Sequence, residues 1–177
     1  MENLQHPKEL GIEFIDSVRA NHALEHATLH VLEEKGLKAA LFGLSDAGGF
    51  WVAGHVTGEM LLEAAREALA RLQGGEVKLA VHENCGTNLA ATGAIVGGLA
   101  WLGMLGVRRG FAHKVERLPL VVLMATIGLV IAQPLGPLLQ QKFTTLASGR
   151  RREILGLQRY GIGQWIVLRV STRAVEG

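Results

Sequence analysis

The hydrophobic pattern divides the chain into parts of different character. Before residue 84 apolar and polar residues alternate closely, whereas residues 84–107 and 118–141 are two runs of 24 residues without a charged side chain. At about 1.5 Å per residue, each run would be roughly 36 Å long as a helix, longer than a hydrocarbon core of about 30 Å. We therefore expect a transmembrane helical hairpin over residues 88–141.

The pattern before the first apolar run predicts a small mixed domain. Apolar residues recur at helical spacing up to Lys35 and Gly36, a cation followed by a glycine, which is typical of a helix end. Turn residues then separate two apolar runs, as in a β-hairpin. The expected order is helix, strand, strand, helix, strand, over residues 9–35, 37–44, 50–56, 57–72 and 76–82.

The chain after the second apolar run returns to a mixed pattern. Two strand-like pieces, residues 153–160 and 164–171, are separated by Gly161 and Gly163, so we expect a second β-hairpin that joins the N-terminal sheet. The predicted fold class is α+β, with three parts. These are an α+β domain (1–87), the transmembrane hairpin (88–141) and C-terminal strands packing on the first domain (142–177).

Charge and composition narrow the location and the partners. Charged residues make up only 19% of the chain and the net charge is +2, which argues against a nucleic-acid partner. The N-terminal segment is polar and shows no signal peptide. We therefore expect a multi-pass protein of the cell's inner (cytoplasmic) membrane with both termini in the cytoplasm. Gly93 and Gly97 have the spacing that lets two membrane helices approach closely, which predicts a homo-oligomer.

The chemistry is concentrated in one stretch of the first helix. His22, His26 and His30 are four residues apart and so share one face, with Glu25 beside the first pair. Two imidazoles one turn apart can bind a transition metal, and a neighbouring carboxylate can take a proton from metal-bound water. The alternative is a histidine stripe that only packs or forms hydrogen bonds.

The order His22-x-x-Glu25-His26 resembles the inverted zinc-peptidase motif of the inverzincins. The resemblance implies that both histidines bind zinc and that Glu25 is the general base. A zinc site needs a third protein ligand, and the candidates in order of preference are His82, Cys85 and Glu59. His30 is expected to orient another group or to bind substrate.

Cys85 supports a rival hypothesis. A cysteine at a helix N-terminus feels the positive end of the helix dipole, which lowers the pKa of the thiol and favours a reactive thiolate. The base of such a thiol site would be His82, three residues earlier, or His22 and His26 if their helix packs there. The simpler interpretation is a small buried residue in a tight turn.

Three segments together resemble a family of uncharacterised small bacterial membrane proteins with two membrane helices. They are HALEHATLHVL, SDAGGFW and HENCGTN, the last followed by the apolar pair. The similarity covers about the first 100 residues and implies the membrane placement, but the family is a domain of unknown function and implies no activity.

The function we expect is a membrane-anchored zinc-dependent hydrolase. Its substrate would be a membrane-bound protein or peptide, and another transition metal could replace zinc. Two alternatives stay open: a non-enzymatic protein that binds metal or haem, and a structural partner within the lipid bilayer.

Overall fold

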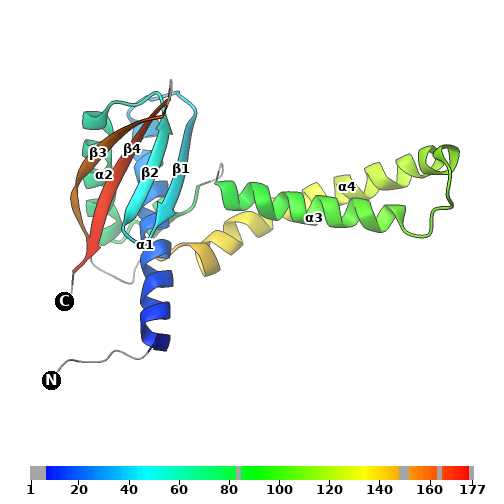
Figure 1. Cartoon of the computed structure of the whole chain (residues 1–177), viewed down its shortest axis with the longest axis horizontal. Coiled ribbons are helices and arrows are strands. Elements are labelled where there is room, and N and C mark those ends of the chain that lie inside the picture. Colours follow the sequence, from blue (N-terminus) through cyan, green and yellow to red (C-terminus); the bar gives the residue numbers. More distant parts are fainter. Residues whose placement is uncertain (1–6, 83–84, 148–151, 163–164, 176–177) are drawn as a thin grey trace. The chain divides into compact units, whose positions relative to one another are not determined.

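The computed structural model describes residues 7–82, 85–147, 152–162 and 165–175. These residues divide into two compact units (Figure 1). The first unit lies within residues 1–82 and 143–177, and the second lies within residues 83–142.

The first unit contains a four-stranded antiparallel sheet with the order β1-β2-β4-β3. The bounds of the strands are β1 (Leu41–Asp46), β2 (Gly49–Gly54), β3 (Arg152–Ile162) and β4 (Trp165–Ala174). Strand β2 pairs with β4, so that Trp51 lies opposite Arg169. The prediction that a C-terminal hairpin returns to the N-terminal sheet is therefore confirmed, and so is the mixed α+β fold.

Helices α1 (Pro7–Glu34) and α2 (Gly58–Gln73) pack with this sheet around one core. Alternate residues of β2, Phe50 and Val52, are fully buried in this core, as the two-residue period of a strand requires. Thr57 caps α2, because its hydroxyl accepts a hydrogen bond from the Met60 N–H. The other buried members come from both helices and β4 and include Leu24, Ala27, Val31, Leu61, Ala65, Leu168 and Val170.

The strand predicted over residues 76–82 is wrong. This segment instead contains a short 3₁₀ helix, η1 (Val77–Ala80), and joins no sheet. The Leu79 N–H bonds to the Glu76 carbonyl within the turn, while the carbonyls of Ala80 and Val81 accept hydrogen bonds from histidines of α1. The backbone carbonyls at the end of this segment are hydrogen-bonded to a helix rather than to a neighbouring strand. An alternating sequence pattern fits both arrangements and cannot distinguish them.

The second unit is an antiparallel pair of apolar helices, α3 (Gly86–Met104) and α4 (Phe111–Leu139), and a π-helical turn, η2 (Gln140–Thr144), follows α4 in the chain. Helices α3 and α4 are long and apolar enough to cross a membrane. Glycines allow their close approach: a Cβ atom on Gly128 would lie 3.0 Å from the Val96 Cα. By contrast, a Cβ atom on Gly93 or Gly97 would meet nothing within 4 Å, so these two glycines are not used within the hairpin.

Candidate metal centre

The three histidines of α1 each bond to a backbone carbonyl of the first unit. The His22 Nδ1 atom lies 3.0 Å from the Thr144 oxygen, and the His26 Nδ1 atom lies 2.8 Å from the Ala80 oxygen. For His30 it is the Nε2 atom that lies 2.7 Å from the Val81 oxygen. Because a carbonyl oxygen can only accept, each of these nitrogens carries the hydrogen and donates it.

These bonds fix the tautomer of each ring. In the neutral imidazole the second ring nitrogen then carries the lone pair, which is Nε2 in His22 and His26 and Nδ1 in His30. A ring N–H bonded to a backbone carbonyl is also the usual support for a metal-binding histidine, because it orients the ring and makes the other nitrogen more basic. The hydrogen bonds of α1 are therefore compatible with metal binding.

Three side chains form a compact group at the C-terminal end of α1. Ligand atoms of His30, Glu33 and His82 all lie within 4.8 Å of one another. One carboxylate oxygen of Glu33 is 3.2 Å from His82 Nε2, and the other is 3.9 Å from His30 Nδ1. Two imidazoles and a carboxylate are a donor set that Zn²⁺ and similar transition ions bind well.

The group is buried on one side and open on the other. The His82 side chain is only 6% exposed, whereas the Glu33 side chain is 55% exposed. Burial lowers the pKa of His82, and the nearby His30 adds to this effect, whereas Glu33 opposes it. An ion could reach the group from the side of Glu33, and it would take the place of the hydrogen that His82 Nε2 donates to the Glu33 carboxylate.

Four imidazole rings of the first unit lie next to one another, in the order His22, His26, His82 and His30. The ring centres are 4.2 Å apart for His22 and His26, 5.9 Å for His26 and His82, and 4.7 Å for His82 and His30. Two segments of the first unit are hydrogen-bonded to α1 near these rings. Ala80, at the end of η1, and Val81, which follows it, accept hydrogen bonds from His26 and His30. The Leu146 N–H donates to the Arg19 carbonyl at 3.1 Å.

Glu25, the predicted general base, is placed against the sheet. It is 4% exposed, and its carboxylate accepts a hydrogen bond of 2.5 Å from the Ser45 hydroxyl. A Cβ atom built on Gly43 would lie 1.9 Å from the Glu25 Oε1 atom. The carboxylate therefore occupies the space that the glycine leaves open on β1.

Replacing Gly43 by alanine should displace Glu25 and lower the free energy of unfolding by about 1–3 kcal/mol, the usual cost of overpacking. Gly156→Ala is the matched control on β3, because its Cβ would meet nothing within 4 Å. Denaturant unfolding followed by circular dichroism would compare the two variants. Equal stability of both would show that Glu25 can move without cost, contrary to this packing.

The structure places the remaining predicted ligands as follows. His82 joins His30 and Glu33, whereas Glu59 is exposed in the first turn of α2. Cys85 belongs to the second unit, where it caps α3 and its sulfur accepts a hydrogen bond from the Thr87 N–H at 3.4 Å. Sequence reasoning did not propose Glu33 as a ligand, although its spacing of three residues from His30 places both on one helix face.

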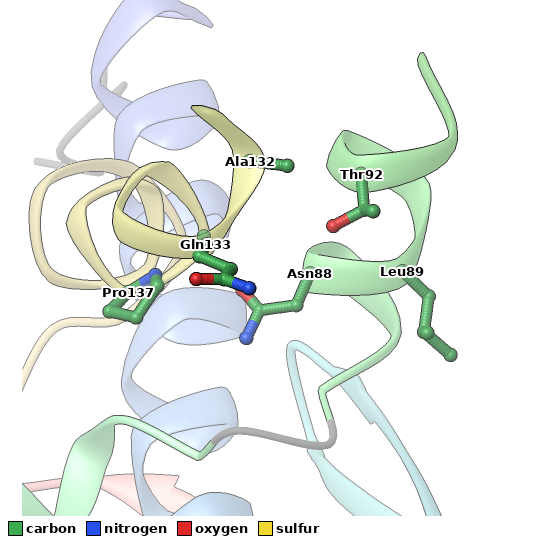
Figure 2. Close-up of a pocket in the computed structure, with 7 residues that line it drawn as sticks. Asn88, Leu89, Thr92, Ala132, Gln133 and Pro137 are labelled. Atoms are coloured by element: carbon green, nitrogen blue, oxygen red, sulfur yellow. The ribbon is translucent and has the colours of Figure 1, made fainter. Parts of the chain in front are cut away.

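The second unit has a cleft of about 280 Å³ between α3 and α4, lined by both polar and apolar residues. Figure 2 shows the carboxamides of Asn88 and Gln133 pointing toward one another and the Thr92 hydroxyl directed toward the same gap. Leu89 and Pro137 complete its walls. These side chains offer hydrogen bonds but no titratable group, so this cleft does not compete with the histidine cluster as a catalytic or metal centre.

Comparison with known proteins adds a family but no activity. An uncharacterized protein of Picosynechococcus sp. (strain ATCC 27264 / PCC 7002 / PR-6) is 37% identical over 105 residues, covering 52% of this chain and 51% of that protein. The match thus spans about half the length of this relative. No solved structure matches the chain. The sequence model of the domain of unknown function DUF6391 matches residues 17–157, most of the chain, and the protein therefore belongs to this family.

Proposed function

We propose that this protein is a membrane-anchored metal-binding protein whose ion is held by His30, Glu33 and His82. The observation that carries the proposal is the position of Glu33, whose two oxygens face the imidazoles of two separate segments. An exposed carboxylate beside one histidine is common, whereas a carboxylate shared by two histidines, one of them buried, suits a cation. When bound, the ion would have three protein ligands and one position left for water or a further ligand.

The donor set favours zinc or a similar transition ion. Imidazole nitrogens suit Zn²⁺, Ni²⁺ and Cu²⁺, whereas Mg²⁺ and Ca²⁺ prefer sites made of oxygen atoms alone. Binding Zn²⁺ requires neutral histidines, and the lowered pKa of His82 favours that form. We therefore take zinc as the first ion to test.

Anchoring in the lipid bilayer is proposed from α3 and α4. Their length and mean hydropathy, 1.2 and 2.1 in the most apolar windows, support two membrane crossings. Two crossings leave both ends of the hairpin on one side of the membrane, and the proposal is that the membrane is the inner membrane and that this side is the cytoplasm. The open positions at Gly93 and Gly97 support a second copy of the chain as a partner in the membrane.

Zinc-dependent hydrolysis is the second candidate function. The motif His22-x-x-Glu25-His26 supports it, with a membrane-bound protein or peptide as substrate. However, Glu25 is buried, bonded to Ser45 and packed over Gly43, which favours a structural role for this carboxylate. Binding of an ion is therefore the leading proposal. Hydrolysis of a peptide by the wild type that disappears in Glu25→Gln, with the zinc content unchanged, would reverse this order.

The test of the leading proposal is a zinc titration of the full chain in detergent after removal of bound metal. Glu33→Gln should weaken the tightest binding event by at least roughly tenfold, because it removes a charged ligand while keeping the shape of the side chain. Glu34→Gln is the control, since Glu34 is adjacent but pairs with Arg71 at 2.5 Å. Equal zinc affinities for the wild type and Glu33→Gln would refute the proposed site.

A further inference from the structure

We infer that α1 carries a second metal site, formed by His22 and His26, so that the chain holds two transition ions next to one another. The inference rests on the proposed function and extends it from one ion to two. It also changes the site predicted from the sequence, in which His22, His26 and His82 would share a single ion.

The geometry of the pair suits a shared ion. One ring nitrogen of His22 lies within 4.8 Å of one of His26, and the rings meet edge to face with an angle of 61° between their planes. Zinc binds imidazole nitrogen at about 2.0–2.1 Å in a tetrahedral site, so two nitrogens on one ion lie roughly 3.4 Å apart. Rotation of the half-buried His22 ring would bring the nitrogens to this distance, whereas His26 is only 1% exposed and stays in place.

Both rings are also oriented by hydrogen bonds. Each ring gives its Nδ1 hydrogen to a carbonyl, His22 to Thr144 and His26 to Ala80, so that both lone pairs are on Nε2. In the chain, Ala80 precedes the second unit and Thr144 follows it. A ring N–H bonded to a backbone carbonyl is the usual support of a metal-binding histidine, and here it makes Nε2 the ligand atom of both rings.

The four imidazoles divide into two groups. Ligand atoms of His30, Glu33 and His82 lie within 4.8 Å of one another, and ring nitrogens of His22 and His26 do so in a separate group. His82 directs its Nε2 to Glu33, which follows His30 in the helix. The His82 nitrogen that faces Glu33 therefore belongs to the group at Glu33 and not to the pair of His22 and His26.

The two sites should differ in affinity. The pair His22 and His26 offers two neutral nitrogens, whereas the other group adds the negative charge of Glu33. The site at Glu33 should therefore fill first, and the pair should bind a second ion more weakly.

The experiment uses variants that keep the hydrogen bonds. Asparagine has its amide nitrogen at about the place of Nδ1, so His22→Asn and His26→Asn can still donate to their carbonyls but lose the Nε2 ligand. The amide nitrogen of glutamine lies at about the place of Nε2 instead, so His30→Gln keeps the hydrogen bond to the Val81 carbonyl and loses the Nδ1 ligand. His55→Ala is the control, because His55 is exposed after the end of β2.

Metal-free full chain in detergent would be titrated with Zn²⁺ alone, with ions per chain counted by elemental analysis and circular dichroism confirming the fold. We expect two ions in the wild type and in His55→Ala. His22→Asn and His26→Asn should lose the weaker ion and keep the tighter one, and His30→Gln should weaken the tighter one by at least roughly tenfold.

The outcomes separate the two proposals. One ion in the wild type, with the same affinity in folded His22→Asn and His26→Asn, would overturn the second site and leave the proposed function intact. Two ions that both persist in these variants would overturn it as well. Unchanged binding in Glu33→Gln and His30→Gln would instead refute the first site, whatever the asparagine variants show.

Discussion

Replacing Phe50 by alanine is expected to lower the free energy of unfolding of the first unit by about 3–5 kcal/mol. Phe50 is the largest fully buried side chain of the described residues, and it lies on β2 in the core with α1, α2 and β4. The loss combines the apolar surface that is no longer buried and the cavity that remains. Because domains of this size are stable by only about 5–15 kcal/mol, this change would remove a large fraction of the total.

Phe42→Ala is the matched control for this measurement. Phe42 is the same residue type on the neighbouring strand β1, but it is 74% exposed. Its replacement should change the stability by no more than about 0.5 kcal/mol. Urea unfolding of the full chain in detergent, followed by far-ultraviolet circular dichroism, would compare them. Equal losses in the two variants would contradict the assignment of the core to one face of the sheet.

Asn21→Ala should cost about 2–4 kcal/mol, the second-largest effect that we expect. Asn21 is fully buried, and its amide nitrogen donates to the Asp46 carbonyl at 2.7 Å. Its oxygen accepts a bond of 2.6 Å from the Thr172 hydroxyl, which also accepts one of 3.0 Å from Arg152. Alanine would remove a partner from the buried Thr172 hydroxyl and from the carbonyl of the half-buried Asp46, each at a cost of about 1–3 kcal/mol.

This hydrogen-bond network connects α1 to the three strands β1, β3 and β4. Arg152 also donates to the Ser17 carbonyl of α1 at 3.1 Å, so the helix and the C-terminal hairpin share buried hydrogen bonds. Gln158→Ala is the control, since Gln158 is an exposed polar residue of β3, and its loss should stay within about 0.5 kcal/mol. The same urea titration would measure both. A cost below 1 kcal/mol for Asn21→Ala would show that the network contributes little to stability.

The elements defined by local rules were predictable from the sequence. The two uncharged runs identified α3 and α4, because helix length and side-chain polarity are properties of the segment itself. The helix expected over residues 57–72 is α2, and the helical face of His22, His26 and His30 followed from their spacing. The apolar run over residues 50–56 likewise indicated the strand β2, in which Phe50 and Val52 are buried.

The grouping of the chemical side chains was decided by tertiary structure. The sequence by itself determined which histidines share a face of α1, but their partners are carbonyls of Ala80, Val81 and Thr144, up to 122 residues away. The fold also placed His82 beside Glu33 and Glu25 beside Ser45. Helical periodicity acts over a few residues, whereas a site depends on backbone and side-chain atoms that meet only when separate segments pack together.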